Sequence, residues 1–202
     1  NLLRLFEEAL RTGMMIHPDA MRLVKSNLDL IDNDMRTTPE AQRIFLDLML
    51  KHGNPERALR RMNELGVLGA FIPEFENIVA MMQFNMYHSY TVDEHTIQCI
   101  TNLAQIERGE LVEDLPLVSS ILEKGVNRKV LYVALLLHDI AKPATFSYDE
   151  GAQRIRFNGH DKLGAEMANN ILRGLKYPNT VIAAVTAMVD NHMAFKDVQH
   201  MR

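Results

Sequence analysis

The sequence predicts an all-α fold, a helical bundle with one small β-hairpin. Apolar residues recur at helical spacing through most of the 202 residues. Gly and Pro stand at the ends of these periodic stretches, where helices begin and stop. Only the stretch 146–157 instead alternates around aromatic residues, which is typical of paired strands.

The first half of the chain contains four predicted helices. Asn54-Pro55 is the clearest helix start, because Asn caps a helix and Pro is tolerated in its first turn. The apolar stretch 67–82 is broken by Gly69 and Pro73, so we expect turns and a short helix there. The four helices cover residues 2–12, 18–31, 40–53 and 56–65.

The second half contains four further predicted helices and the hairpin. Thr91, followed three residues later by Glu94, forms a capping box that opens the first of them. Residues 127–141 are strongly apolar, and we expect the central helix there, ended by Pro143. The helices cover residues 94–111, 127–141, 161–175 and 180–194, and the hairpin covers 146–157.

Composition limits the classes of function. The net charge is −4 and the pI about 6.1, unlike a protein that wraps nucleic acid. Arg57, Arg60 and Arg61 are locally basic, and we interpret them as a solvated helix face. No apolar run is long enough for a membrane span, and no signal peptide is recognisable. Cys99 is the single cysteine and is expected to be a buried thiol, which fits a reducing, cytoplasmic location.

The adjacent residues His138 and Asp139 lie near the end of the apolar helix. Burial of this polar pair is costly unless both groups are satisfied, and a metal ion at a helix edge would satisfy both. Lys142 lies on the same face and can meet a phosphate oxygen. The alternative is a His-Asp pair that caps the last turn, where His also suits the helix dipole. The dipeptide alone favours that alternative.

Three further histidines change this interpretation. His95, His160 and His192 are each expected at a helix terminus, where a bundle can gather them around one cleft. Imidazole and carboxylate ligands suit Mn, Fe, Co or Zn, with Mg possible where carboxylates dominate. Such an ion polarises a phosphoryl oxygen and lowers the pKa of its bound water. The pattern therefore predicts a divalent metal site for phosphoester hydrolysis, with His95, His138, Asp139, His160 and His192 as ligands and Asp139 and Lys142 as catalytic residues.

This order of residues, together with the motif HDIAKP, resembles the pattern of the HD superfamily of metal-dependent phosphohydrolases. Residues 1–142 most resemble the HD region of bifunctional PII uridylyltransferase/uridylyl-removing enzymes, through NPERALRRMNELGVLGAFIPEF, MMQFNMYHSYTVDEHTI and LYVALLLHDIAK. The resemblance implies an HD-domain bundle at 81–202, preceded by a helical linker at 1–80. It also implies hydrolysis of uridylyl-PII to PII and UMP, with the PII signal protein as partner.

Residues 143–202 instead resemble the HD region of tRNA nucleotidyltransferases and poly(A)-polymerase-like proteins. This likeness implies an alternative, an RNA or nucleotide phosphoester substrate or a non-catalytic scaffold. Two origins stay open, a branch between the families or a hybrid chain. HD enzymes usually take a last Asp ligand from a helix further downstream, so we expect a domain truncated at its C-terminus, with Asp190 or Asp197 as weak substitutes. Asp32-Asn33-Asp34 lacks the Gly-Ser of a nucleotidyltransferase and is interpreted as a helix terminus.

Overall fold

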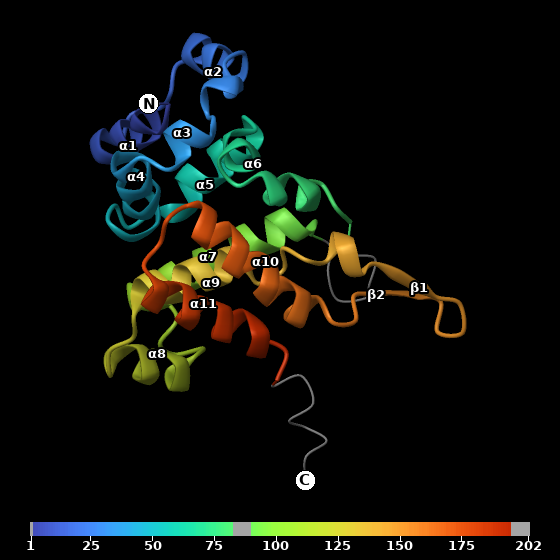
Figure 1. The fold of residues 1–202 in the computed structure, drawn as a ribbon. Coiled ribbons are helices and arrows are strands. Elements are labelled where there is room, and N and C mark those ends of the chain that lie inside the picture. The colour runs from blue at the N-terminus through green and yellow to red at the C-terminus, as the bar shows by residue number, and fades with distance from the viewer. Residues whose placement is uncertain (1, 83–89, 195–202) are drawn as a thin grey trace.

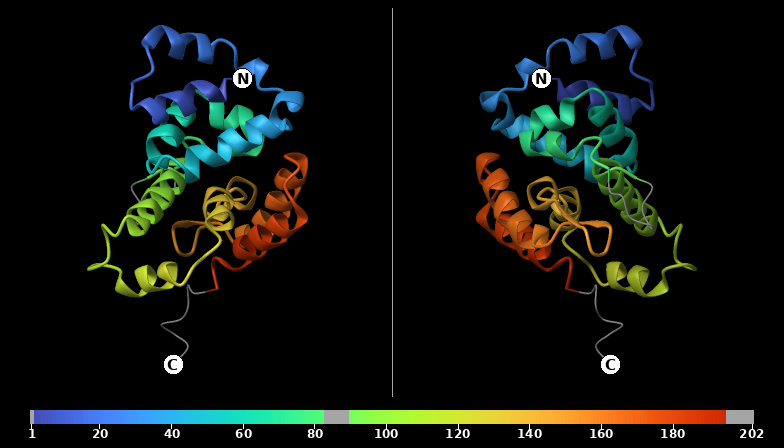
Figure 2. Two further views of the ribbon diagram at one scale, coloured as in Figure 1. Left: turned by 90° about the vertical axis from the view of Figure 1, so that its left-hand side faces the viewer. Right: turned by 90° about the vertical axis from the view of Figure 1, so that its right-hand side faces the viewer.

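The computed structural model describes residues 2–82 and 90–194, and it is the helical bundle that the sequence predicts. The N-terminal helices lie at one end of the molecule and the later helices at the other, while the hairpin projects from the side (Figures 1 and 2). No helix in the described ranges is both long enough and apolar enough to cross a membrane.

The N-terminal part is a cluster of short helices. Asn54 accepts a hydrogen bond from the Arg57 amide at 3.2 Å, which confirms the predicted cap. The elements are α1 (Leu3–Thr12), α2 (Pro18–Lys25), η1 (Leu28–Leu30), α3 (Asn33–Arg36), α4 (Pro39–Leu50), α5 (Pro55–Glu64), α6 (Val67–Phe71) and η2 (Pro73–Ile78), where η marks a 3-10 helix.

The C-terminal part holds the longest helices and the hairpin. The strands pair antiparallel, with Tyr148 opposite Ile155, as the alternating pattern predicts. The elements are α7 (Val92–Glu107), α8 (Pro116–Glu123), α9 (Arg128–Leu137), η3 (Pro143–Thr145), β1 (Ser147–Asp149), β2 (Arg154–Arg156), α10 (His160–Gly174) and α11 (Asn179–Asn191).

One apolar core joins the two parts. Phe45 of α4 stacks on Phe71 of α6, with ring centroids 4.5 Å apart, and both rings are buried. Helix α5 packs against α7 and α4 packs against α9, so the N-terminal helices support α7 and α9. Helix α11 packs against both α9 and α10. These contacts fix the helix ends that build the site.

Several predicted boundaries were wrong. The helix expected at 18–31 ends at Lys25, and η1 follows it. The helix expected at 127–141 ends at Leu137, well before Pro143, and the chain continues in turns. The exposed helix α8 was not predicted, although Pro116 stands at its first turn. Asp32 begins α3 by accepting a hydrogen bond from the Met35 amide at 2.8 Å, so this acidic motif is a helix terminus.

The predicted capping box is also wrong. Thr91 is the first residue before α7, but its side chain makes no capping hydrogen bond. Glu94 turns away to pair with Arg60, which also pairs with Glu56 at 3.0 Å. Arg60 is therefore half-buried and ties α5 to α7 instead of lying on a freely solvated face.

We expect Leu59→Ala to lower the free energy of unfolding by about 2–5 kcal/mol, because the Leu59 side chain is fully buried in the core. Leu117→Ala is the matched control, since Leu117 is 72% exposed on α8, and it should change stability by less than about 0.5 kcal/mol. Urea unfolding followed by circular dichroism measures both. Equal losses in the two variants would contradict the assignment of the core.

Candidate metal centre

Four histidines and one carboxylate meet where four helices begin or end. His95 lies in the first turn of α7, and His160 is the first residue of α10. His138 and His192 are the residues directly after α9 and α11. Asp139 follows His138 in the chain. The structure thus brings together all five residues that the sequence predicts as metal ligands.

The carboxylate of Asp139 lies between two pairs of imidazoles. Its Oδ2 is 3.2 Å from Nε2 of His138 and 3.9 Å from Nε2 of His95. Its Oδ1 is 3.5 Å from Nε2 of His160 and 3.9 Å from Nε2 of His192. The side chain of Asp139 is almost fully buried. One carboxylate can therefore serve two adjacent ion positions, one at each oxygen.

The backbone sets the direction of three of these imidazoles. Nδ1 of His138, His160 and His192 lies 2.6 Å from the carbonyl oxygen three residues earlier, in each case. A carbonyl oxygen only accepts, so Nδ1 must carry the proton and donate it. The Nε2 lone pair is then left toward Asp139, the arrangement that a metal-ligating His requires.

Two of these lone pairs face each other. Nε2 of His160 and Nε2 of His192 are 3.1 Å apart, and their rings meet edge to face. Two acceptors at this distance repel unless a proton or a cation lies between them. An ion about 2.0–2.1 Å from each nitrogen would separate them by about 2.9–3.4 Å, depending on its coordination geometry. The spacing and the donor set therefore fit a divalent metal ion.

Lys142 lies beside the same carboxylate. Its Nζ donates to Oδ2 of Asp139 at 2.7 Å and lies 5.5 Å from the centre of the Phe157 ring. The side chain is buried, as a charged group can be when it is paired. The structure therefore places Lys142 at the centre, with its ammonium next to the ion positions.

Charge and burial act against each other on the titrating groups. Burial raises the pKa of Asp139, but His138, His160 and Lys142 outweigh it and hold that pKa well below its usual value. Burial lowers the pKa of His138, but the Asp139 carboxylate and the Leu135 carbonyl outweigh it, so the pKa is raised. For His192, burial prevails and lowers the pKa. The carboxylate thus stays ionised at the middle of the cluster.

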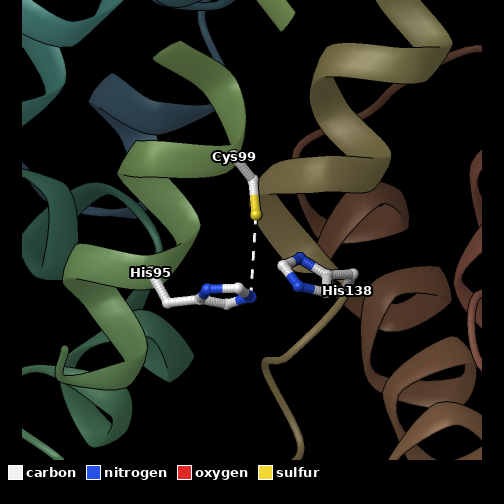
Figure 3. A group of neighbouring side chains, drawn as sticks. All are labelled: His95, Cys99 and His138. Atoms are coloured by element: carbon white, nitrogen blue, oxygen red, sulfur yellow. Dashed lines mark hydrogen bonds between the residues drawn. The ribbon is translucent and has the colours of Figure 1, made fainter. Parts of the chain in front are cut away.

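Cys99 is a member of the cluster that sequence reasoning missed. It lies four residues after His95 on α7, and its Sγ is 3.6 Å from Nε2 of His95 (Figure 3). The thiol is only partly buried, and burial raises its pKa to about 11. Residues four apart share a helix face, so the His95–Cys99 spacing was the signal available in the sequence.

The ligand atoms fall into two groups among the described residues. One group is His95, Cys99 and His138, and the other is Asp139, His160 and His192; within each, the atoms lie within 4.8 Å of one another. A groove of about 560 Å³ lies elsewhere, between the ends of α7, α8 and α9, and contains none of these six residues.

A glycine lets α10 approach the other helices closely. A Cβ added at Gly164 would lie 3.3 Å from Cγ1 of Val189 and 3.6 Å from the carbonyl oxygen of His138. The first distance is tighter than most Cβ contacts, and the second is an ordinary van der Waals contact. Gly164 thus allows α10 to hold His160 against the ends of α9 and α11.

Asp190 and Asp197 were the weak candidates for the last Asp ligand of the site. Asp190 pairs with Lys162, with Oδ1 and Nζ 3.0 Å apart, and belongs to neither ligand group. Asp197 lies outside the described residues, so its predicted role stays a prediction.

The model of the HD domain family matches residues 92–199, which include every histidine and the Asp of the cluster. The chain belongs to the HD domain family. A second model, described as the uridylyltransferase GlnD third domain, matches residues 1–71.

Relatives of this HD-family chain are bifunctional uridylyltransferase/uridylyl-removing enzymes. The enzyme of Ruegeria pomeroyi is 65% identical over the whole chain, and that of Cereibacter sphaeroides is 57% identical. The enzyme of Azospirillum brasilense is 42% identical over 96% of the chain. The chain spans about a fifth of the length of these relatives, 20–21%.

The same matches bear on residues 143–202, which resemble tRNA nucleotidyltransferases in the sequence. Two relatives align over 100% of the chain, the hairpin and the last helices included. A chain joined from two families would match each of them over only part of its length. The second half therefore belongs with the first, and a hybrid origin is not needed to explain it.

We expect Asp139→Asn to destabilise the metal-free chain by about 3–5 kcal/mol, because it leaves buried Lys142 without its anion. The folded-state pKa of Asp139 is lowered, so its contribution is complete above the unfolded value near 3.8 and is lost as pH falls through the folded value. Asp149→Asn, in an ion pair of the hairpin, is the control and should have little effect. Thermal unfolding in chelator at pH 7 compares them, and equal stability of Asp139→Asn and wild type would contradict the argument.

Proposed function

We propose that this chain is the uridylyl-removing phosphohydrolase region of a larger bifunctional enzyme, and that it hydrolyses uridylyl-PII to PII and UMP. The observation that carries the proposal is the convergence of four imidazoles on the two oxygens of Asp139. The names of the relatives support the uridylyl-removing reaction over other phosphoester substrates.

Residues of the cluster would hold divalent ions. The proposed ligands are His95, His138, Asp139, His160 and His192, and Mn, Fe, Co, Zn or Mg is compatible with imidazole and carboxylate donors. When bound, such ions polarise a phosphoryl oxygen and lower the pKa of water toward neutrality.

The chain's own catalytic groups would be Asp139 and Lys142. Asp139 remains ionised, so its carboxylate can accept a hydrogen bond from the attacking water and orient it. The Lys142 ammonium lies 2.7 Å from that carboxylate, and it would donate to a phosphoryl oxygen as negative charge develops there. The oxygen of the water would bond to phosphorus, the bond from phosphorus to the PII oxygen would break, and UMP would be released while a proton passes to that PII oxygen.

We further propose a division into a helical linker region over residues 1–80 and an HD domain over 81–202. The separate family matches to residues 1–71 and 92–199 support this boundary. We also propose a cytoplasmic location for the chain, in line with the proposed PII partner. Cys99, the single cysteine, forms no disulfide, which supports a reducing compartment.

Metal content tests the site directly. We expect the wild-type chain to bind divalent ions and to hydrolyse bis(p-nitrophenyl) phosphate. Asp139→Ala should lower the content of bound ion, and it should lower the rate of hydrolysis by about 100-fold or more. Asp190→Asn is the matched control, because its carboxylate pairs with Lys162 outside the cluster, and it should retain both. Mass spectrometry of bound metal and a colorimetric assay measure them. Retained metal and an unchanged rate in Asp139→Ala would reject the site.

Uridylylated PII tests the substrate. We expect the metal-loaded chain to release UMP from uridylyl-PII. Lys142→Ala should lower kcat strongly and change KM little, because the ammonium acts on charge that develops in the transition state. Chromatography of UMP measures release. Hydrolysis of the model diester without any UMP from uridylyl-PII would reject PII as the substrate and leave the phosphohydrolase proposal standing.

A further inference from the structure

The two halves of the centre differ in chemistry. The half that contains Asp139, His160 and His192 offers nitrogen and oxygen atoms. The half that contains His95, Cys99 and His138 offers sulfur as well. The family pattern of the sequence explains the histidines and the aspartate, but it gives no role to Cys99.

The position of Cys99 is set by its helix. His95 and Cys99 lie one turn apart on α7, and both side chains extend from that helix toward His138 (Figure 3). The rings of His95 and His138 have centroids 5.6 Å apart. The sulfur thus lies at the side of the cluster that α7 and α9 enclose.

The distance between the sulfur and the His95 imidazole matches shared coordination. A tetrahedral ion about 2.3 Å from sulfur and about 2.05 Å from nitrogen separates these atoms by about 3.5 Å. The observed distance between Sγ of Cys99 and Nε2 of His95 is 3.6 Å. A simple thiol–imidazole hydrogen bond also permits this distance, but it does not require the ligand atom of His138 within 4.8 Å of both.

We propose that Cys99 supplies a thiolate ligand to the ion held by His95 and His138, and that this half of the centre thereby prefers a thiophilic ion such as Zn²⁺ over Mg²⁺ or Mn²⁺. The inference rests on the proposed metal site. On binding, the Sγ–H bond breaks, the proton passes to solvent, and a sulfur lone pair forms the bond to the ion. Sulfur ligands select Zn²⁺ among the divalent ions because Mg²⁺ and Mn²⁺ favour oxygen.

Cobalt substitution tests the sulfur bond without relying on activity. Co²⁺ bound to a thiolate gives an intense charge-transfer band in the near ultraviolet, which nitrogen and oxygen ligands alone do not produce. We expect this band in the Co²⁺-loaded wild-type chain and its loss in both Cys99→Ser and Cys99→Ala. Asn102→Ala, an exposed change on the same helix, is the control and should keep the band. The Kd for Zn²⁺ should rise roughly tenfold or more in the cysteine variants, with a smaller change for Mn²⁺.

The single cysteine gives a second readout. Since Cys99 is the only cysteine in the sequence, alkylation by iodoacetamide reports on this thiol alone. We expect Zn²⁺ to slow alkylation in the wild-type chain and to have no such effect in His95→Ala. Circular dichroism confirms that each variant is folded.

The outcomes separate the two proposals. Bound Co²⁺ without a charge-transfer band, together with alkylation that Zn²⁺ does not slow, would reject the thiolate ligand and leave the metal site intact. A band that persists in His95→Ala would reject a shared ion, because the sulfur would then bind metal elsewhere. Absence of bound metal in the wild-type chain would reject the metal site itself and the thiolate with it.

Discussion

The buried carboxylate of Asp139 is the constraint on which the rest of this structure depends. A carboxylate removed from water costs several kcal/mol unless compensating charges and donors surround it. Here Lys142 compensates it on one side, and the four imidazoles around both oxygens do so when their Nε2 atoms carry a proton or share an ion with the carboxylate. The imidazoles arrive on four different helices, so α7, α9, α10 and α11 must all bring one end to the same point. The bundle's packing serves that convergence, and Gly164 leaves α10 without a side chain where it faces Val189 and the His138 carbonyl.

The sequence was sufficient to predict most of the helices, the hairpin and the five residues of the cluster, but not the residues at which the helices end. Apolar periodicity reports which face of a helix is buried, and Pro143 only sets the latest point at which a helix that precedes it must end. It does not prevent α9 from opening at Leu137, where His138 bonds the Leu135 carbonyl and turns its other nitrogen to Asp139. Helix α8 was missed although its apolar residues recur at helical spacing; it is only eight residues long, and most of those residues are exposed, with Leu117 at 72%.

Cys99 shows a different limit. Taken alone in an apolar helix it reads as an ordinary core thiol, since free cysteine packs as a small hydrophobe. Its significance appears only beside His95, and then only because α9 brings His138 to the same side. Likewise, residues 143–202 first suggested a second family, although the relatives align through them. A likeness over part of the chain carries less information than a match over its full length.

The three bonds from imidazole Nδ1 to a carbonyl three residues earlier have a consequence for how this centre tolerates change over evolution. Each ring is aimed by its own helix end, so surrounding side chains can be exchanged while the aim persists. Adding or deleting one residue within α9 or α11 is different, because each residue turns the helix by about 100°. Such an indel would swing an imidazole out of the cluster at once. Related chains should therefore keep the lengths of these helices unchanged, and the hairpin loop should absorb the length differences.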